Sequence, residues 1–414
     1  MVSWGTTVWK FGLVPQSVAN GLTNILILFF LLQNLHGSLL DVGLVTGIAA
    51  LALIPSQMVW GKLVDSVGRC KPFLVVGFIG MGAAVAAIPF AGSMPLLLVV
   101  VTSKSLLYAA TLPARQLLTV ESEERNGWQR GLANMQFLTA IGETAGMGLG
   151  TALVATLGFA DLFLISGVLC LLSAVALGVL AQEPGLMIQR RLVSLERSVG
   201  TIVAVSDYAG YSRLSPGRLP AGDIARILNR STKYLLVGIF CFSLAGSAFY
   251  SPLPAYLLRF QSSQAVFFIF FIGSLAGAVG YLMVGRLFSS AAKNLLLSSF
   301  SRMVILPMLV LGALGALPGL VAAAIVLALL EILWSLFDVS SMFAYLETAK
   351  VGRAGFYGGL VGLGSAGGGF MGGFLSNAWG FESLFVLCSI LCAVALAAFV
   401  LQYRNGAESL PVGG

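Results

Sequence analysis

Three ionisable residues interrupt long apolar stretches of this sequence: Lys104, Glu143 and Glu331. A charge surrounded by hydrocarbon is costly, so each such residue is a functional hypothesis by default. A lysine beside a glutamate can form an ion pair, whereas a buried carboxylate without a cation can exchange a proton instead. We therefore predict an ion pair between Lys104 and Glu143, with a permanent structural bridge as the alternative. Glu331 is predicted to be the more protonatable group.

Further polar side chains share helix faces with these charges. Residues three and four apart lie on one face of an α-helix, which places Tyr108 beside Lys104 and Asp338 two turns beyond Glu331. An N-terminal stretch adds amides. The predicted binding and proton pathway comprises Gln16, Asn20, Asn24, Lys104, Tyr108, Glu143, Tyr250, Glu331 and Trp334. These groups suit an amphipathic organic molecule.

The elements that carry these residues must be membrane helices. Hydrophobic residues make up 58% of the 414 residues, and the mean hydropathy of +0.96 is outside the usual range of soluble domains. Open sheet edges are not viable in lipid, so helices are expected. Apolar runs long enough to cross a bilayer predict twelve spans, the first retained rather than cleaved as a signal peptide. They lie near residues 9–33, 40–61, 72–92, 95–119, 132–156, 160–181, 234–257, 265–285, 294–314, 319–344, 355–376 and 382–402.

The helical rise places these charges at different depths. Lys104, Glu143 and Glu331 fall near the bilayer centre. Arg115 and Asp338 fall roughly 31 and 28 Å from the outer ends of their spans, at the inner mouth. Their charges are opposite, so we predict that they form a cytoplasmic gate. Interfacial anchors that snorkel towards water are the alternative.

Basic residues set the orientation of the spans. Of the loops on one side, only the loop after the seventh span carries a basic residue, Arg259. The positive-inside rule assigns the other side to the cytoplasm, with both termini. The formal net charge of +7 then reports orientation in a plasma (inner) membrane and not a nucleic-acid partner. The predicted partners of this functional monomer are the lipid bilayer and a small organic solute.

The two halves of the sequence resemble each other at an offset of 222 or 223 residues. The segment beginning at Gly158 resembles the segment beginning at Gly380, and Arg130 aligns with Arg353. We therefore predict two six-helix halves, residues 1–183 and 233–405. A basic cytoplasmic linker, residues 184–232, joins them, and residues 406–414 form a tail.

Glycines at four-residue spacing occur in both halves. They are Gly142, Gly146 and Gly150 in the fifth predicted span, and Gly364, Gly368, Gly372 and the adjacent Gly373 in the eleventh. This spacing lets helix backbones approach closely. The stripes predict either fixed packing or a hinge surface along which helices slide.

The loop after the second span carries a cluster of charges and glycines. It reads Gly61-x-Leu63-x-Asp65-x-x-Gly68-Arg69-x-Lys71 and resembles the loop signature of the major facilitator superfamily. The resemblance implies that Asp65 faces the start of the eleventh span. We also predict that Arg69 and Lys71 pair with Glu121 or Glu124. Positive-inside topology alone is the alternative.

The same resemblance implies a fold and an activity. The fold is an all-α integral membrane protein of two pseudo-symmetric halves, with spans one, four, seven and ten around a central cavity. The activity is secondary transport by alternating access. The glycines from Gly364 to Gly373 also resemble an antiporter pattern, with Gly369 at its proline position, and favour export.

These observations predict a secondary active transporter of a small organic, amphipathic solute, with H+ as the coupling ion. An uptake carrier for a sugar or metabolite is one alternative, and a non-transporting membrane receptor or scaffold is another. We find no phosphate-binding loop and no convincing nucleophile–base pair in the sequence, so an enzyme is not expected. With five cysteines mostly inside spans and His36 as the only histidine, neither a metal site nor a cofactor is expected.

Overall fold

The computed structural model describes residues 8–121, 128–181, 233–284, 290–311, 319–348 and 354–407. The predicted linker, most of the predicted tail and Glu124 lie outside these residues, as do the side chains of Asp65 and Glu121. The domain boundaries that depend on the linker stay predictions. All the regular elements named below, from the described part of the chain, are helices.

The N-terminal helices follow the predicted spans. They are η1 (Trp9–Leu13), α2 (Val14–Phe29), the π-helical turn η2 (Phe30–Asn34), α3 (Leu39–Val67), α4 (Lys71–Ala87), η3 (Ile88–Phe90), α5 (Met94–Glu121), α6 (Trp128–Leu153) and α7 (Phe159–Leu180). Ser38 and Asp41 form a capping box that starts α3. Gly68 ends α3 with a φ of 65°, a left-handed conformation that glycine adopts without strain. This accounts for one glycine of the charged loop.

The C-terminal helices are α10 (Lys233–Tyr250), α11 (Leu253–Leu257), α12 (Ser263–Met283), α13 (Ala291–Leu311), α14 (Leu320–Thr348), α15 (Ala354–Ala378) and α16 (Gly380–Ala407). Every predicted span overlaps one long helix of the described chain. Within the described residues, nine helices are long and apolar enough to cross a membrane; α6, α13 and α15 are not among them. An all-helical membrane protein is confirmed, and the number of twelve spans stays a prediction.

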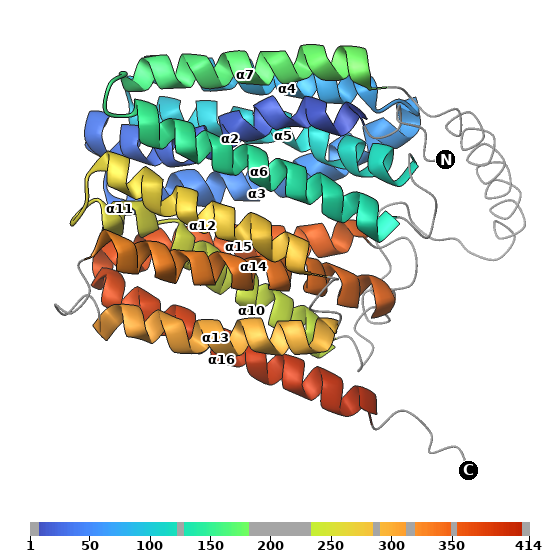
Figure 1. The fold of residues 1–414 in the computed structure, drawn as a ribbon, viewed down its shortest axis with the longest axis vertical. Helices are drawn as coiled ribbons and strands as arrows, with labels where there is room; N and C mark the ends of the chain where they lie inside the picture. The colour runs from blue at the N-terminus through green and yellow to red at the C-terminus, as the bar shows by residue number, and fades with distance from the viewer. Residues whose placement is uncertain are drawn as a thin grey trace, which may run out of the picture.

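The two sets of helices pack in the same way. In the first set α2 packs against α6, and α4 against α7; in the second α10 packs against α15, and α13 against α16. The sets meet where α3 packs against α15 and α6 against α12, near the middle of the view in Figure 1. The structure is therefore a bundle of two similar halves that meet at this interface. We call the set from η1 to α7 the N-half and the set from α10 to α16 the C-half.

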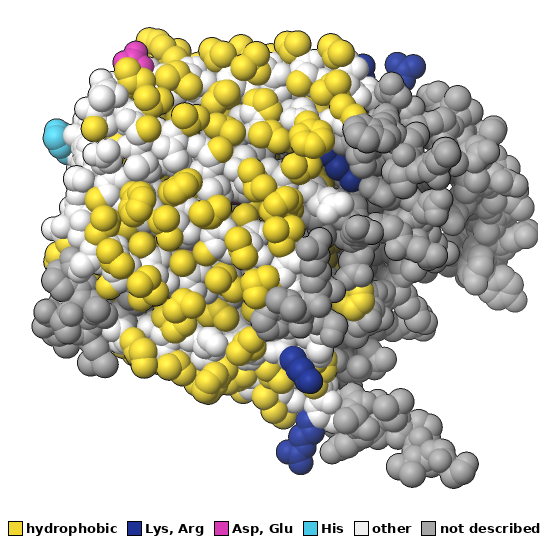
Figure 2. All heavy atoms as spheres, viewed as in Figure 1, with side chains coloured by type: hydrophobic (Ala, Val, Ile, Leu, Met, Phe, Trp, Pro, Cys, Tyr) yellow, Lys and Arg dark blue, Asp and Glu magenta, His cyan; other side chains and the backbone are white. Residues whose placement is uncertain are grey.

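The outer surface suits lipid. Hydrophobic side chains are spread over the whole described face in Figure 2, and Val175 and Val179 on α7 are 65% and 75% exposed. The Lys and Arg side chains on this face lie towards its right-hand end, whereas acidic side chains and histidine show at the left. We call the end of the bundle with Gly68 the motif end and the end with His36 the far end.

Contacts between the halves close the far end. The hydroxyls of Thr46 and Ser251 are 2.8 Å apart, and Gln33 donates a hydrogen bond of 3.2 Å to Ser263. A Cβ at Gly373 would overlap the backbone of Gly43 on the opposite half. Nearer the motif end, a Cβ at Gly358 would meet its nearest neighbour at 3.6 Å, an ordinary van der Waals distance. The far end is therefore closed.

The glycine stripes serve close packing inside each half. A Cβ at Gly142 would lie 2.5 Å from the Cβ of Ser17 on α2, and one at Gly364 would lie 3.0 Å from the Cβ of Ser243 on α10. Gly146 and Gly368 approach the backbones of the same two helices. In each half, the stripe therefore joins equivalent helices in an equivalent way.

The ends of the stripes reach the other half. Gly150 faces Phe267 on α12, while Gly372 faces Ala248 on α10 and the adjacent Gly373 faces Gly43 on α3. The stripes therefore contribute mainly to packing within a half, with Gly150 and Gly373 at the interface between halves.

We expect Gly146→Val to destabilise the protein, because its side chain would overlap the backbone of Val18. Overpacking of this kind costs about 1–3 kcal/mol. Gly178→Ala is the control, since the nearest atom to its Cβ would be 3.9 Å away. Thermal unfolding in detergent measures both variants; equal midpoints for the two would contradict the close approach of α6 to α2.

Candidate functional site

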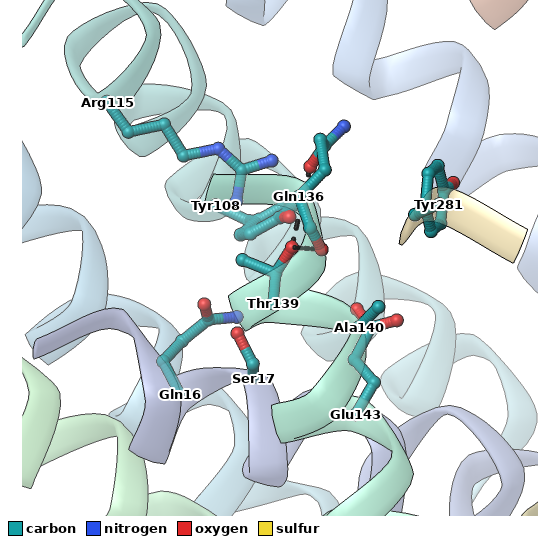
Figure 3. Close-up of a pocket in the computed structure, with 9 residues that line it drawn as sticks. All are labelled: Gln16, Ser17, Tyr108, Arg115, Gln136, Thr139, Ala140, Glu143 and Tyr281. Carbon is teal, nitrogen blue, oxygen red and sulfur yellow. Dashed lines mark hydrogen bonds between the residues drawn. The ribbon is translucent and has the colours of Figure 1, made fainter. Parts of the chain in front are cut away.

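A polar cavity lies between the N-half and α12 (Figure 3). Its volume is about 190 Å³. Helix α2 contributes Gln16 and Ser17, α5 contributes Tyr108 and Arg115, α6 contributes Gln136, Thr139, Ala140 and Glu143, and α12 contributes Tyr281. Ala140 is the one apolar residue among these lining residues. A cavity of this size is smaller than the roughly 300–1,000 Å³ of drug-sized pockets. It would therefore enclose a head group or a small solute.

Asparagines take the positions between the predicted ion-pair partners. Lys104 is 8% exposed, and its ammonium donates a hydrogen bond of 3.2 Å to Asn24 Oδ1. One turn away, Asn20 Nδ2 donates to Glu143 Oε1 at 3.1 Å. Among these described side chains, the predicted Lys104–Glu143 ion pair is not formed, because each charge is bound to an amide of α2 instead. Asn24 is exposed between buried neighbours, which indicates that it faces the space inside the bundle.

Arg115 and Asp338 face different partners in this structure. The Arg115 guanidinium lies 5.7 Å from the centre of the Tyr108 ring and borders the cavity, and its Nε is buried without a hydrogen-bond partner. The Asp338 carboxylate accepts a hydrogen bond of 3.1 Å from the Tyr281 hydroxyl. The two described side chains of the predicted gate are therefore not paired in this conformation.

Glu331 lies in the C-half, against α12. A Cβ at Gly277 would be 3.5 Å from Glu331 Oε2, so the small residue makes room for the carboxyl group. Ser335, one turn along α14, donates a hydrogen bond of 2.8 Å to the carbonyl of Gly277 and holds the two helices together. The Tyr250 hydroxyl faces the Glu331 carboxyl from α10.

Arg302 on α13 is a functional candidate that the sequence analysis missed. It is 2% exposed, and its Nη2 donates to the Leu330 carbonyl at 2.9 Å and to the Tyr250 hydroxyl at 3.2 Å. Its guanidinium carbon lies 5.0, 5.5 and 5.3 Å from the ring centres of Phe242, Tyr250 and Trp334. The sequence could have indicated this residue, because Arg302 is an ionisable residue well inside the predicted span 294–314, and such residues are functional candidates.

The predicted pathway thus divides into two groups. Gln16, Tyr108 and Glu143 line the cavity, with Asn20 behind Glu143. Tyr250 and Trp334 belong to the aromatic group around Arg302, where their rings are 6.4 Å apart. The structure also adds lining residues that the sequence analysis did not select: Ser17, Gln136, Thr139 and Tyr281.

The charged loop lies at the motif end. Lys62 and Arg69 are exposed, and Gly61 faces Pro113 of α5 at 4.0 Å from its ideal Cβ position. The acidic partners proposed for this loop lie outside the described side chains. Among the described residues, no group of three or more His, Cys, Asp or Glu side chains could hold a metal ion.

Comparison with known proteins agrees with this architecture. The chain is 25% identical over 304 residues to the multidrug efflux pump Tap of Mycolicibacterium fortuitum, covering 69% of this chain and 68% of the relative. The crystal structure of the peptide transporter POT, a point mutant in complex with sulfate, superposes with a TM-score of 0.70 at 15% identity. That match covers 98% of this chain and 94% of the other. At this identity it shows the fold alone.

The family model of the Major Facilitator Superfamily matches residues 11–372, nearly the whole chain. Membership points to transport of a small molecule rather than to an enzyme. The predicted family and the all-helical membrane fold are confirmed. The chain is a multi-pass membrane transporter and belongs to the Major Facilitator Superfamily.

Proposed function

We propose that this transporter exports a small amphipathic organic solute and that H+ is the coupling ion. The observation that carries the coupling is Glu331, a carboxyl group inside the bundle beside Tyr250 and Arg302. Uptake of a proton neutralises this group, and its release restores an anion next to a buried cation. Such a change alters the electrostatic balance of the C-half, since charges in hydrocarbon interact strongly. A reversible charge of this kind can couple a proton to a conformational change.

Export is supported by the efflux relative and by the chemistry of the interior. Tap is a multidrug efflux pump, and aromatic side chains such as Tyr108 and Trp334 suit the apolar part of an organic solute. Uptake of a sugar is less well supported, because Asn20 and Asn24 are already bound to Glu143 and Lys104. In this conformation these two amides therefore use hydrogen-bonding groups that a sugar hydroxyl would need.

The different closure of the two ends supports alternating access. The far end is closed by contacts between halves, and the cavity with its unpaired Arg115 lies on the motif side. We propose that the motif end is cytoplasmic, since Lys62 and Arg69 are exposed there. Opening of the far end would bring Arg115 to Asp338, which would exchange its Tyr281 hydrogen bond for an ion pair. The plasma membrane, a functional monomer and this orientation are parts of the proposal.

Proton movement on ligand binding tests the coupling. We expect purified full-length protein in weakly buffered detergent solution to take up or release protons when an amphipathic ligand from an organic panel binds. Glu331→Gln should bind the ligand but lose the proton signal, because an amide does not titrate. Glu382→Gln, which removes an exposed carboxylate at the far end, is the matched control and should keep the signal. An unchanged signal in Glu331→Gln would sink the proposed coupling site.

Replacement of Arg302 tests its place in the C-half. Arg302→Met removes two hydrogen bonds and leaves Glu331 without its nearby cation, so we expect a loss of stability of about 3–5 kcal/mol. Arg302→Lys should recover part of this loss, because a lysine keeps the charge but not the planar guanidinium. Thermal unfolding in detergent compares these variants with Arg404→Met, which changes an exposed arginine. If Arg302→Met loses no more stability than Arg404→Met, the contacts of Arg302 do not stabilise the C-half.

A further inference from the structure

The cavity holds a cation and an anion that do not pair with each other. Arg115 and Glu143 both line it, and these two described side chains form no ion pair. In Figure 3 the Arg115 guanidinium lies beside Tyr108 and Gln136, whereas Glu143 lies at the opposite end of the α6 residues. Glu143 lies seven positions after Gln136 on α6, which corresponds to roughly 10 Å along the helix axis. The two charges are thus placed at separate ends of one small polar space.

Two buried donors that line the cavity, one of them on Arg115, lack good acceptors. The Gln16 side chain is 1% exposed, and its Nε2 has the Met81 sulfur at 3.9 Å as its acceptor. A thioether is a weak acceptor. Arg115 Nε is buried with no hydrogen-bond partner. Two buried donors of this kind cost free energy unless an acceptor fills the space between them, and an anionic oxygen would be the strongest acceptor.

At the other end, Glu143 offers a carboxylate. Its Oε1 accepts one hydrogen bond, from Asn20, and a carboxylate with two oxygens can accept several. Tyr281 lines the cavity from the C-half. An ammonium group would complement this end of the cavity.

Neither a simple anion nor a simple cation complements both ends. An anion would enter a space that contains Glu143, and a cation would enter a space that contains Arg115, so each would meet one like charge. A molecule with both charges would pair with both Arg115 and Glu143. Charge complementarity therefore favours one class of ligand.

We propose that this cavity binds a zwitterion, with its acidic group at Arg115 and Gln16 and its amine at Glu143. This inference rests on the proposed transport function and narrows its substrate class. The separation of the two side chains calls for a ligand whose charges are several bonds apart. Free zwitterionic solutes and the zwitterionic head groups of amphiphiles share this chemistry.

Binding to a ladder of ω-amino acids tests the proposal. We would titrate the full-length protein in detergent by calorimetry with ω-amino acids of increasing chain length, and with the alkylamine and alkyl carboxylate of each length. We expect an optimum chain length, and single-charge analogues that bind at least about tenfold more weakly. Phosphocholine and a short-chain alkylphosphocholine form a second pair. Binding of the amphiphile alone identifies a head group, and binding of the free zwitterions identifies a free solute.

Two variants that each remove one charge should bind zwitterions more weakly but one single-charge analogue more tightly. A variant that failed to fold would lose all binding, so it could not give this result. Arg115→Gln and Glu143→Gln should each weaken zwitterion binding by at least about tenfold. Glu143→Gln should bind the alkyl carboxylate more tightly than the unaltered protein does, and Arg115→Gln should do the same for the alkylamine. Asp161→Asn, an exposed carboxylate on α7, should change none of these values.

Zwitterions that bind no better than their single-charge analogues would overturn the proposal, as would unchanged binding in both variants. This result would not overturn the proposed function, because the proton-movement experiment tests that function separately. If a ligand of another charge class caused proton movement, the zwitterion proposal would fail and the proposed H+-coupled transport would stand.

Discussion

The cost of placing a charge in hydrocarbon governs how the interior of this molecule is built. Lys104 and Glu143 are each held by an asparagine of α2, and Arg302 is held by a carbonyl, a tyrosine and three aromatic rings. Each arrangement supplies hydrogen bonds that water would otherwise provide. The Nε atoms of Arg115 and Arg302 are both buried without a hydrogen-bond partner, but Arg115 lines the polar cavity and Arg302 does not. At Arg115 a ligand or a second conformation can therefore supply the missing partner.

Helix packing is repeated between the halves, whereas the buried cations Lys104 and Arg302 are not. Gly142 meets Ser17 on α2, and Gly364 meets Ser243 on α10, so the duplicated glycines build the same close contact twice. The positions that correspond to Lys104 and Arg302 at the 223-residue offset are Leu327 and Ile79. One symmetric frame therefore carries an amide-rich set of charges in the N-half and an aromatic set in the C-half. A rocking motion of equivalent halves can then act on two chemically different sites.

Much of this could be predicted from the sequence, because membrane helices must be apolar and of a fixed length. The sequence predicted the helices and the family. It also predicted three residues that line the cavity: Gln16, Tyr108 and Glu143. The Lys104–Glu143 ion pair was a wrong prediction for this conformation, since helix periodicity gives the face of a residue but not the rotation of its neighbour. That rotation inserts Asn20 and Asn24. Arg302 was missed although it is an ionisable residue inside a predicted span, and Tyr281 was missed because it lies near the end of its predicted span.

We propose that the halves exchange closure between the two ends of the bundle. Distances between spin labels in lipid vesicles test it most directly, with one pair at Asn34 and Gln264 on the far end and another at Ser66 and Lys293 on the motif end. All four side chains are exposed. The account predicts that a change of pH together with a bound ligand lengthens the far-end distance and shortens the motif-end distance in the same fraction of molecules. Two distances that stay fixed, or that change in the same direction, would contradict it.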